Sequence, residues 1–515
     1  MRRIETGGEK ALRIAFRVSI IIALSKIAGF AREIVFAAYF GQRLESDAYV
    51  TSYSILNIMF IAFSAGIAST FIPVYTKARL HMGERRASLY GSYIFNLYLV
   101  VGLALSALSY IFAPQICSLI YRGSPEGLAK TVELTRVMFP TVFFWAMTGV
   151  LTNILNARKK FIPEQLVGFV LSFCVIAACT VYGNIEAVAV STTVAAILQF
   201  AVILPFMKGN FKYRPRLNMK DKDLKRTFAL AIPALISVAF DEINALTDRI
   251  FGSSIGTGVV TSLSKSFTLG QTVLGVLIVP ITTIMFTELS NFAAQNQMDK
   301  LKETVRKSIE IVALITFPII VISIVCGQDI IGAVYQRGKF MAADTAFTTP
   351  VFTLYIIGIF GLGLRTFLMR VFHSMQMTKI PMYVGMISVS LNIVLDLLWM
   401  GPLGAKGLTL ATTVASFTGA MLMLLLLHKK IGRMNFRKSA GQFVKIILAT
   451  VFCFAAAWVA HGLIPAHHTT FAAYLLRLLL SGAAGMGAYF LMASILKIDT
   501  MARVTGMFRR RFGRK

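Results

Sequence analysis

The chain has 515 residues, of which 56% are hydrophobic, and its mean hydropathy of +0.71 lies far above the range of soluble proteins. This composition excludes an ordinary soluble domain, so the formal net charge of +29 does not carry its usual implication of nucleic-acid binding. The five cysteines lack metal-ligand spacing and lie mostly in apolar runs, which excludes a disulfide framework.

Apolar runs of about 20 residues recur along the chain, and each is long enough to cross a hydrocarbon core of roughly 30 Å. They predict an all-α polytopic membrane protein with about fourteen transmembrane helices. The first run is too long for the hydrophobic region of a signal peptide, so we expect it to be retained. The predicted spans are 14–40, 46–75, 89–113, 133–156, 163–183, 186–207, 227–252, 258–290, 308–328, 346–374, 380–401, 405–427, 440–462 and 471–496.

Lys and Arg residues are distributed unevenly between the two sides that these spans define. Of the 52, the side that holds both termini has 37, the opposite side has six, and the rest lie within spans. Because cytoplasmic loops of membrane proteins are enriched in Lys and Arg, both termini are predicted to be cytoplasmic. Most of the net charge is therefore a topology signal, although the loop after span 6 and the C-terminal tail are also suited to contact anionic lipid heads.

Three short motifs recur at a nearly constant offset, which indicates an internal repeat. Six spans separate the copies, and an even number keeps the orientation, so the two halves are predicted to be parallel, as in transporters with a site between their halves. We therefore expect a six-helix N-terminal lobe in 1–226, a six-helix C-terminal lobe in 227–439, and two extra helices with a basic cytoplasmic tail in 440–515. The paired residues are Tyr121 and Tyr335, Pro163 and Pro381, and Thr192 and Thr412.

The first span carries two cations, Lys26 and Arg32, with Glu33 beside them and Asp47 at the start of the second span. A charge near the centre of a bilayer costs about 2.5–3.5 kcal/mol on insertion scales, so such residues usually face a cavity or a partner. The cations are about 1.7 helical turns apart, and we expect them to line a cavity that receives an anion, held in place by the two carboxylates. Snorkelling or a purely structural ion pair is the alternative.

Three further cations lie in spans 8 and 10. Lys265 would join the first pair if spans 1 and 8 face each other across the repeat. Arg365 and Arg370 lie toward the cytoplasmic end of span 10, where they either bind the same anion or contact lipid heads. Guanidinium groups suit phosphate because they donate two parallel hydrogen bonds, so a pyrophosphate-bearing lipid is the anion that we expect.

A second polar group in the spans consists of Asp248, Asn392, Asp396 and Thr412. Asn392 and Asp396 are four residues apart and share a helix face. Two carboxylates, an amide oxygen and a hydroxyl are hard ligands, so the group predicts a sodium site. For Asp248 the alternative is an ion pair with its neighbour Arg249.

No catalytic motif is present: the sequence has no Walker motif, no HExxH, no GxSxG and no Cys/His cluster. We therefore expect a transporter rather than an enzyme. Its energy would come from an ion gradient or the membrane potential, which is worth about 2.3 kcal/mol per charge per 100 mV.

The motifs, taken in order, resemble those of the MurJ/MviN lipid II flippases. The resemblance covers spans 1 to 12, and the count of fourteen spans fits the whole chain. The segments that carry it are KIAGFARE at 26–33, Phe40-Gly41, Ser46-Asp47-Ala48, Phe71-Ile-Pro73, Val273-Leu-Gly-Val276 with Pro280, Tyr335 to Phe340, Arg370-Val-Phe372, Thr378 to Pro381, and Gly401-Pro-Leu403.

The resemblance implies membership of the multidrug/oligosaccharidyl-lipid/polysaccharide exporter superfamily, a central cationic cavity, alternating access, and a groove for the lipid tail beside spans 13 and 14. It implies a lipid-linked anionic glycan, lipid II, as substrate, contact with membrane lipids and cell-wall synthesis proteins, no nucleic acid, and a place in the cytoplasmic (inner) membrane. It also implies substrate contacts from Lys26, Arg32 and Lys265, with sodium at Asp248, Asn392, Asp396 and Thr412.

The sequence departs from this family in four places. Lys26 and Lys265 stand where members often have arginine, Phe60 replaces a second-helix arginine, and Ala65 replaces a nearby glutamate. A flippase for another polyprenyl-diphosphate glycan, of O-antigen, teichoic or capsular type, therefore remains an alternative. A cation-coupled drug exporter and a non-transporting scaffold for wall synthesis are further alternatives, but a cationic cavity disfavours the first and the cost of intramembrane charge disfavours the second.

Overall fold

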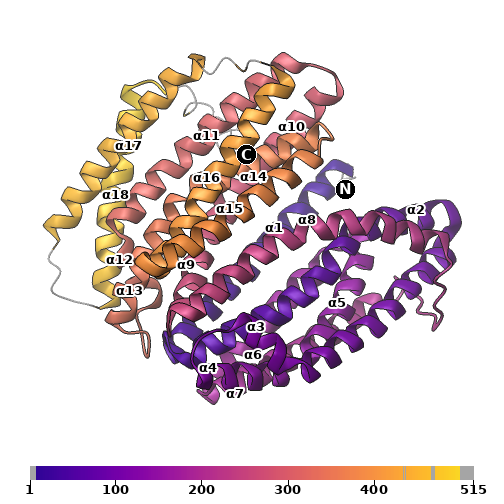
Figure 1. The fold of residues 1–515 in the computed structure, drawn as a ribbon. Coiled ribbons are helices and arrows are strands. Elements are labelled where there is room, and N and C mark those ends of the chain that lie inside the picture. The colour runs from indigo at the N-terminus through magenta and orange to yellow at the C-terminus, as the bar shows by residue number, and fades with distance from the viewer. Residues whose placement is uncertain (1–6, 433, 435–436, 465–469, 499–500, 502–515) are drawn as a thin grey trace, which may run out of the picture. The chain divides into compact units, whose positions relative to one another are not determined.

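The computed structural model describes residues 7–432, 434, 437–464, 470–498 and 501, and within these residues it contains helices and no strand (Figure 1). By length and composition, ten of the described helices can cross a membrane. The number is eleven if α4 (Pro125–Met138) and α5 (Pro140–Ala157), bent by 44° at their junction, form one broken span. The all-helical membrane architecture is thus confirmed, and the count of fourteen spans stays a prediction.

Packing divides the chain into two units, Met1–Thr261 and Ser262–Lys515. Besides α4 and α5, the first unit contains the helices α1 (Gly7–Phe40), α2 (Leu44–Ile111), α3 (Ala113–Ile120), α6 (Ile162–Val181), α7 (Ile185–Met207) and α8 (Lys222–Ile255). In this unit α2 packs against α4, α5 and α8. Helix α6 packs against both α1 and α7.

Local sequence explains where these helices begin and bend. Ser124 and Asn184 precede α4 and α7, and each side chain accepts a hydrogen bond from the backbone N–H three residues later, which caps the free donors of the first turn. Proline stands in the first turn of α5 and α6, where its missing N–H costs nothing. The long α2 joins two predicted spans and is kinked at Gly83, whose φ of 80° favours glycine.

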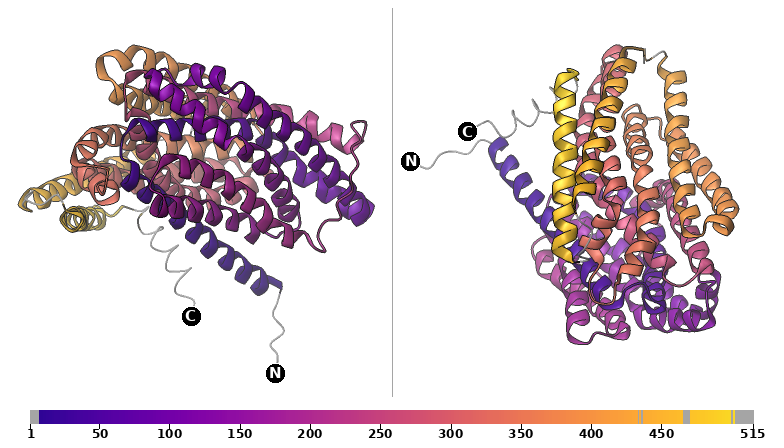
Figure 2. Two further views of the ribbon diagram at one scale, coloured as in Figure 1. Left: turned by 90° about the horizontal axis from the view of Figure 1, so that it is seen from below. Right: turned by 90° about the vertical axis from the view of Figure 1, so that its left-hand side faces the viewer.

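The second unit contains the rest of α9 and all later helices, and its last two helices pack on each other and against α11 and α12 (Figures 1 and 2). Between α9 and α10 lies one short π-helical stretch, η1. The helices are α9 (Val259–Val273), η1 (Leu274–Ile278), α10 (Val279–Ala294), α11 (Met298–Val325), α12 (Gly327–Tyr335), α13 (Ala342–Ile357), α14 (Ile359–Ser374), α15 (Lys379–Leu403), α16 (Ala405–Ile431), α17 (Arg437–Leu463) and α18 (Phe471–Ile495).

The recurring motifs occupy matching places in the two units. Tyr121 follows the short helix α3, and Tyr335 ends the short helix α12. Thr192 and Thr412 are each the eighth residue of their helices, α7 and α16. The repeat seen in the sequence is therefore also a repeat of local structure.

The packing boundary at Thr261 differs from the repeat boundary expected at residue 226. The reason is that α8, predicted as the first helix of the C-terminal lobe, packs along α2 in the first unit. The three-part division into 1–226, 227–439 and 440–515 follows the repeat and stays a prediction. Most of the predicted basic tail lies outside the described residues.

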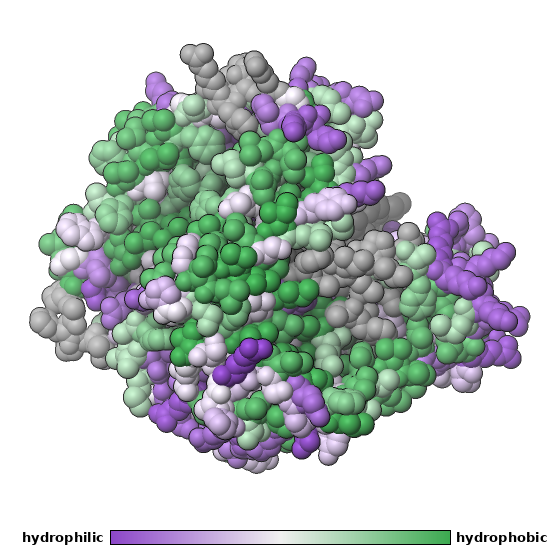
Figure 3. All heavy atoms as spheres, in the orientation of Figure 1, coloured by the Kyte–Doolittle hydropathy of each residue, from purple (hydrophilic) through white to green (hydrophobic). Residues whose placement is uncertain are grey.

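Large apolar side chains cover the outward faces of the helices. Phe173 and Val181 on α6 and Trp458 on α17 are more than 60% exposed. Figure 3 shows hydrophobic residues spread over much of the surface in view, while hydrophilic residues gather in separate patches. Such extensive apolar exposure suits a protein surrounded by lipid.

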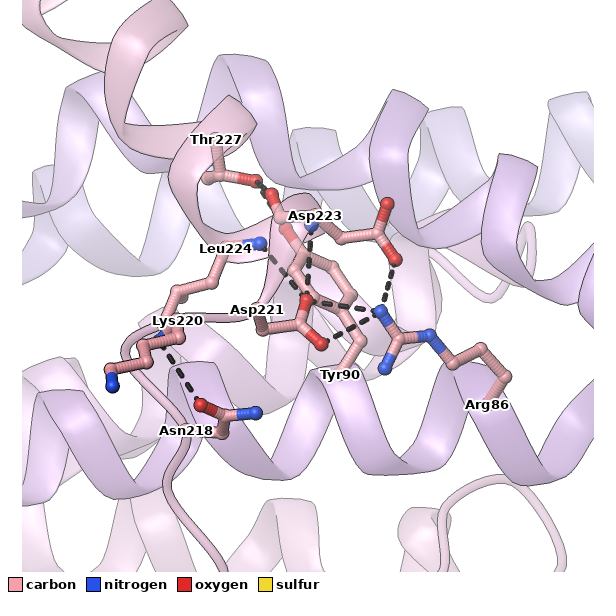
Figure 4. A network of polar contacts seen from close by, with 8 residues as sticks. All are labelled: Arg86, Tyr90, Asn218, Lys220, Asp221, Asp223, Leu224 and Thr227. Carbon is pink, nitrogen blue, oxygen red and sulfur yellow. Dashed lines mark hydrogen bonds and ion pairs between the residues drawn. The ribbon is translucent and has the colours of Figure 1, made fainter.

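The connection between α7 and α8 is fixed to α2 by a polar network (Figure 4). Arg86 forms ion pairs with Asp221 at 2.8 Å and with Asp223 at 2.6 Å. Asp221 also caps α8 by accepting hydrogen bonds from the N–H groups of Asp223 and Leu224. The start of α8 is thereby held to one place on α2.

The residues before this network, 211–216, form a connecting strap along α2. Ser92 accepts a hydrogen bond from the N–H of Arg214 at 2.9 Å, and Asn96 donates to the carbonyl oxygens of Arg214 and Arg216. Ser88 accepts from the N–H of Lys212 at 3.5 Å. Ser88, Ser92 and Asn96 are four residues apart, so they share one face of the helix.

Candidate functional site

The two cations of α1 lie in different environments. The guanidinium of Arg32 pairs with Glu33 at 3.0 Å, and both side chains are 23% exposed. Arg32 also interacts electrostatically with Tyr49 and Tyr53 of α2. Lys26 is exposed on α1. The structure thus brings Arg32 and Glu33 together, and the cavity-lining role of Lys26 stays a prediction.

Asp47 is buried at the start of α2, and the hydrogen bonds that it accepts from described residues come from backbone N–H groups and one hydroxyl. Its carboxylate accepts hydrogen bonds from the N–H of Gly258 at 2.5 Å, and from the N–H and hydroxyl of Thr261 at 2.8 and 2.6 Å. These donors belong to the first turn of α9 and the loop before it, which is a region that favours anionic side chains. Asp47 therefore positions the start of α9, and Lys265 lies on the same helix, four residues after Thr261.

In the second unit, Lys265 is 1% exposed on α9. Its ammonium lies 5.6 Å from the centre of the Tyr335 ring, a cation–π contact. The sequence marked Tyr335 only as part of the repeat, because nothing in a linear motif shows that a tyrosine faces a lysine seventy residues away. Arg365 and Arg370 are half-buried on α14.

The residues predicted to hold sodium fall into both units. Asn392 and Asp396 are buried one turn apart on α15, and α15 packs against α16, which carries Thr412. Neither amide atom of Asn392 has a hydrogen-bond partner among the described residues. The hydroxyl of Thr412 donates to the carbonyl of Leu408, which leaves its oxygen lone pairs able to meet a cation. This donor set fits a small hard cation.

Asp248 lies on α8 in the first unit. Its buried Oδ1 makes no hydrogen bond to any residue that the structure describes, and its carboxylate interacts electrostatically with Arg249. Whether Asp248 binds sodium or pairs with Arg249 stays a prediction. Among the described residues, no group of three or more His, Cys, Asp or Glu side chains is arranged to hold a metal.

A buried network that the sequence did not predict ties α12 to the last two helices. Asp329 of α12 is fully buried and contacts His461 of α17 at 2.7 Å and Arg477 of α18 at 3.4 Å. Arg477 also lies 3.1 Å from the imidazole of His461. Arg477 is thus engaged with a carboxylate of its own unit.

The sequence profile of the family described as "Lipid II flippase MurJ" matches residues 36–479. A relative in Rickettsia prowazekii, named a probable lipid II flippase MurJ, is 27% identical over 417 residues, which are 78% of this chain and 82% of the relative. Another in Treponema pallidum, with the same name, is 25% identical over 470 residues, covering 87% of this chain and 88% of the relative.

Solved structures agree in fold. A lipid II flippase MurJ in an inward closed conformation superposes with a TM-score of 0.79 at 22% identity, covering 94% of this chain and all of that chain. Because the family profile extends over most of the sequence and the fold agrees, the chain belongs to the lipid II flippase MurJ family.

Proposed function

We propose that this chain translocates lipid II, the undecaprenyl-diphosphate-linked precursor of peptidoglycan, from the inner to the outer leaflet of the cytoplasmic membrane by alternating access. The family match over residues 36–479 is the observation that carries the proposal. The chain acts as a transporter, and its substrate is a lipid-linked anionic glycan that it meets within the membrane.

The cations act on the diphosphate of the head group. Arg32 suits this task because its guanidinium can donate two parallel hydrogen bonds to a phosphate, and Glu33 holds the guanidinium in place. Lys265 contributes a point charge from a buried position, where its attraction to an anion is little screened. Lys26 and Arg370 add positive charge from α1 and α14.

A sodium ion would be held in the second unit by Asn392, Asp396 and Thr412, with Asp248 as the fourth predicted ligand. When bound, the ion neutralises a buried carboxylate and so changes the relative free energies of the conformations that the unit adopts. The buried amide of Asn392 supports this sodium site, because neither of its polar atoms has a hydrogen-bond partner among the described residues. Sodium or the membrane potential would then reset the cycle.

A flippase for another polyprenyl-diphosphate glycan is the second candidate function. It is favoured by Phe60, which stands where some family members have an arginine, and by the lysines at positions 26 and 265. A lysine binds phosphate as a point charge and lacks the paired geometry of arginine. Partner proteins from cell-wall synthesis and the cytoplasmic placement of both termini complete the proposal.

The test is to express the chain in bacteria depleted of their own lipid II flippase and to score growth and externally accessible lipid II. We expect the native chain to rescue both. Arg32→Ala and Lys265→Ala should abolish rescue, whereas Lys406→Ala, which removes an exposed cation, should not. Failure of the native chain despite normal insertion would favour the second candidate, to be tested with other polyprenyl-diphosphate glycans.

A further inference from the structure

The first unit contains a cavity of about 280 Å³ whose lining comes from α2, α5, α6 and α7. Three aromatic side chains form one part of its wall: Tyr53 and Phe60 from α2, and Trp145 from α5. The ring centres of Tyr53 and Trp145 are 5.5 Å apart with the planes at 76°, and those of Phe60 and Trp145 are 5.8 Å apart. The wall therefore presents both ring faces and ring edges.

The indole of Trp145 is held by a relay of hydrogen bonds. Its N–H donates to the side-chain oxygen of Gln199 at 3.2 Å, and the amide nitrogen of Gln199 donates to the carbonyl of Val167 at 2.8 Å. Gln199 is 2% exposed and its amide is used at both ends. The aromatic wall is thus set in advance of any ligand.

The buried polar part of the lining is neutral. The Thr148 hydroxyl lines the cavity, is buried, and has no hydrogen-bond partner among the described residues. Asn57 adds an amide group from α2. A buried hydroxyl without a partner is unfavourable until a ligand or a water molecule meets it, so Thr148 marks a position where a ligand group belongs.

The cavity adjoins the proposed diphosphate contact, because Tyr53 belongs to its wall and also interacts electrostatically with Arg32. In a polyprenyl-diphosphate glycan the first sugar is joined directly to the diphosphate. The other phosphate carries the prenyl chain, so the group that binds next to Arg32 is either the sugar or the start of that chain when Arg32 binds the diphosphate. The buried hydroxyl of Thr148 and the amide of Asn57 favour the sugar, because a hydrocarbon chain would leave both polar groups without a partner.

We propose that this cavity binds one N-acetylhexosamine ring of the head group, an inference that rests on the proposed function. A pyranose has an apolar face of C–H groups that stacks on aromatic rings, and a rim of hydroxyl and acetamide groups that pairs with neutral donors and acceptors such as Thr148 and Asn57. The volume lies near the lower end of the roughly 300–1,000 Å³ of small-molecule sites, which suits a single ring.

A protonated amine from the peptide part of the head group is the other ligand that an aromatic wall attracts. The observations disfavour it, because the one carboxylate of the lining, Glu164, is exposed and accepts a hydrogen bond from Asn156 at 2.9 Å. The buried part of the lining carries no charge to balance an ammonium.

Trp145 offers a direct readout, because the chain has only three tryptophans. In a Trp399→Phe, Trp458→Phe background the full-length protein in detergent retains Trp145 as its sole tryptophan. The probe is N,N′-diacetylchitobiose, a neutral N-acetylhexosamine disaccharide without diphosphate or lipid. We expect a saturable change in Trp145 fluorescence, and no change with maltose or with lysine amide.

Two variants separate binding from folding. Thr148→Val removes only the hydroxyl that has no partner among the described residues, and we expect about tenfold weaker disaccharide binding. Gly149→Ala places a methyl group 3.6 Å from the Phe60 ring, which fits without a clash but narrows the cavity, so we also expect weaker binding. Thr180→Val and Gly385→Ala, which alter an exposed threonine and a glycine with open space around it, are the matched controls.

Translocation of lipid II in flippase-depleted bacteria is measured in parallel with the native chain. Rescue together with a disaccharide response that Thr148→Val weakens supports the inference. Rescue without any disaccharide response, a response that the two cavity variants leave unchanged, or a response to lysine amide instead overturns it and leaves the proposed function standing. A disaccharide response without rescue supports the sugar site and overturns lipid II as the substrate.

Discussion

Asp47 is a buried carboxylate whose hydrogen bonds hold the start of α9, whereas its place in the sequence predicts that it holds cations in position. Its position after Lys26 and Arg32 suggested a counter-ion for those cations, but its oxygens accept three hydrogen bonds from Gly258 and Thr261. With 1% of its surface exposed, Asp47 has no access to bulk water. Asp47 therefore fixes the start of α9, and its part in substrate binding stays a prediction.

We predict that Asp47→Asn lowers the thermal stability of the purified protein. The amide keeps one acceptor oxygen but presents an NH₂ group to a backbone donor, so the change costs roughly 1–3 kcal/mol. The measurement is the unfolding midpoint in detergent. Glu45→Gln is the matched control, because Glu45 lies in the same first turn but is exposed. Equal midpoints for the two variants would contradict the positioning role.

Sequence reasoning found Arg32, Glu33 and Lys265 because charged residues in apolar runs stand out. It did not find Tyr335 beside Lys265, or Trp145 beside Tyr53, because aromatic residues are common in membrane helices and their partners lie far away in the sequence. Helical periodicity identifies which residues share a face, but the neighbour of that face depends on how the helices pack.

At the scale of elements, the network of Asp329, His461 and Arg477 fastens the last two helices to α12. Breaking a buried ion pair by removing one partner leaves an uncompensated charge, which typically costs 3–5 kcal/mol. The network therefore makes α17 and α18 part of the second unit rather than a loose addition, although they fall outside the repeat.

We predict that Arg477→Leu lowers the unfolding midpoint strongly, whereas Lys445→Leu does not. Lys445 on α17 is the control for Arg477, because it is also a cation of the last two helices but makes a long hydrogen bond of 3.4 Å to the carbonyl of Lys497. A double variant, Asp329→Asn with Arg477→Leu, should be less destabilised than the sum of the single changes. Additive losses would show that the two residues act independently.

The connecting strap, residues 211–216, has a conformation that its sequence does not predict. Its basic residues indicate the side of the membrane on which it lies, but they do not indicate the path of its backbone. The hydrogen bonds to Ser92 and Asn96 hold the strap in an extended path along α2.

We predict that Asn96→Ala makes this strap more sensitive to trypsin, with cleavage after Lys212 or Arg216 several times faster than in the native chain. A protease needs a segment that can leave its place and enter the active site of the enzyme. Asn210→Ala is the control, because the hydrogen bonds that the Asn210 side chain makes to described residues go to carbonyls of its own turn, those of Phe206 and Lys208. Unchanged cleavage would mean that Asn96 does not hold the strap.

At the scale of the whole molecule, the predicted topology can be tested by reporter fusions. Alkaline phosphatase is active only outside the cytoplasm, so it should be active when fused after Lys339 and inactive after Lys379. A fluorescent protein fused to Lys515 should fluoresce. These results would place the C-terminus and the loop at Lys379 in the cytoplasm and the loop at Lys339 outside it, as the distribution of Lys and Arg predicts. Activity after Lys379 would show that the predicted number of spans before it is wrong.

The sequence predicted the class of fold well, because each apolar run carries its own information about length and hydropathy. It located the repeat from three motifs, and Thr192 and Thr412 occupy the same place in α7 and α16. It did not predict that α8 packs with α2, since the pairing of apolar helices in lipid depends on small differences in side-chain packing.

The two copies of the repeat share a pattern of helices but differ in their charged residues. The offset between Pro163 and Pro381 places Cys174 and Ala178 of α6 at the positions that Asn392 and Asp396 occupy in α15. One half of the repeat has an amide and an acid at these positions, and the other has a thiol and a methyl group. A sodium ion bound as proposed would act on one half alone, so two halves that look alike in outline would respond differently to the same salt.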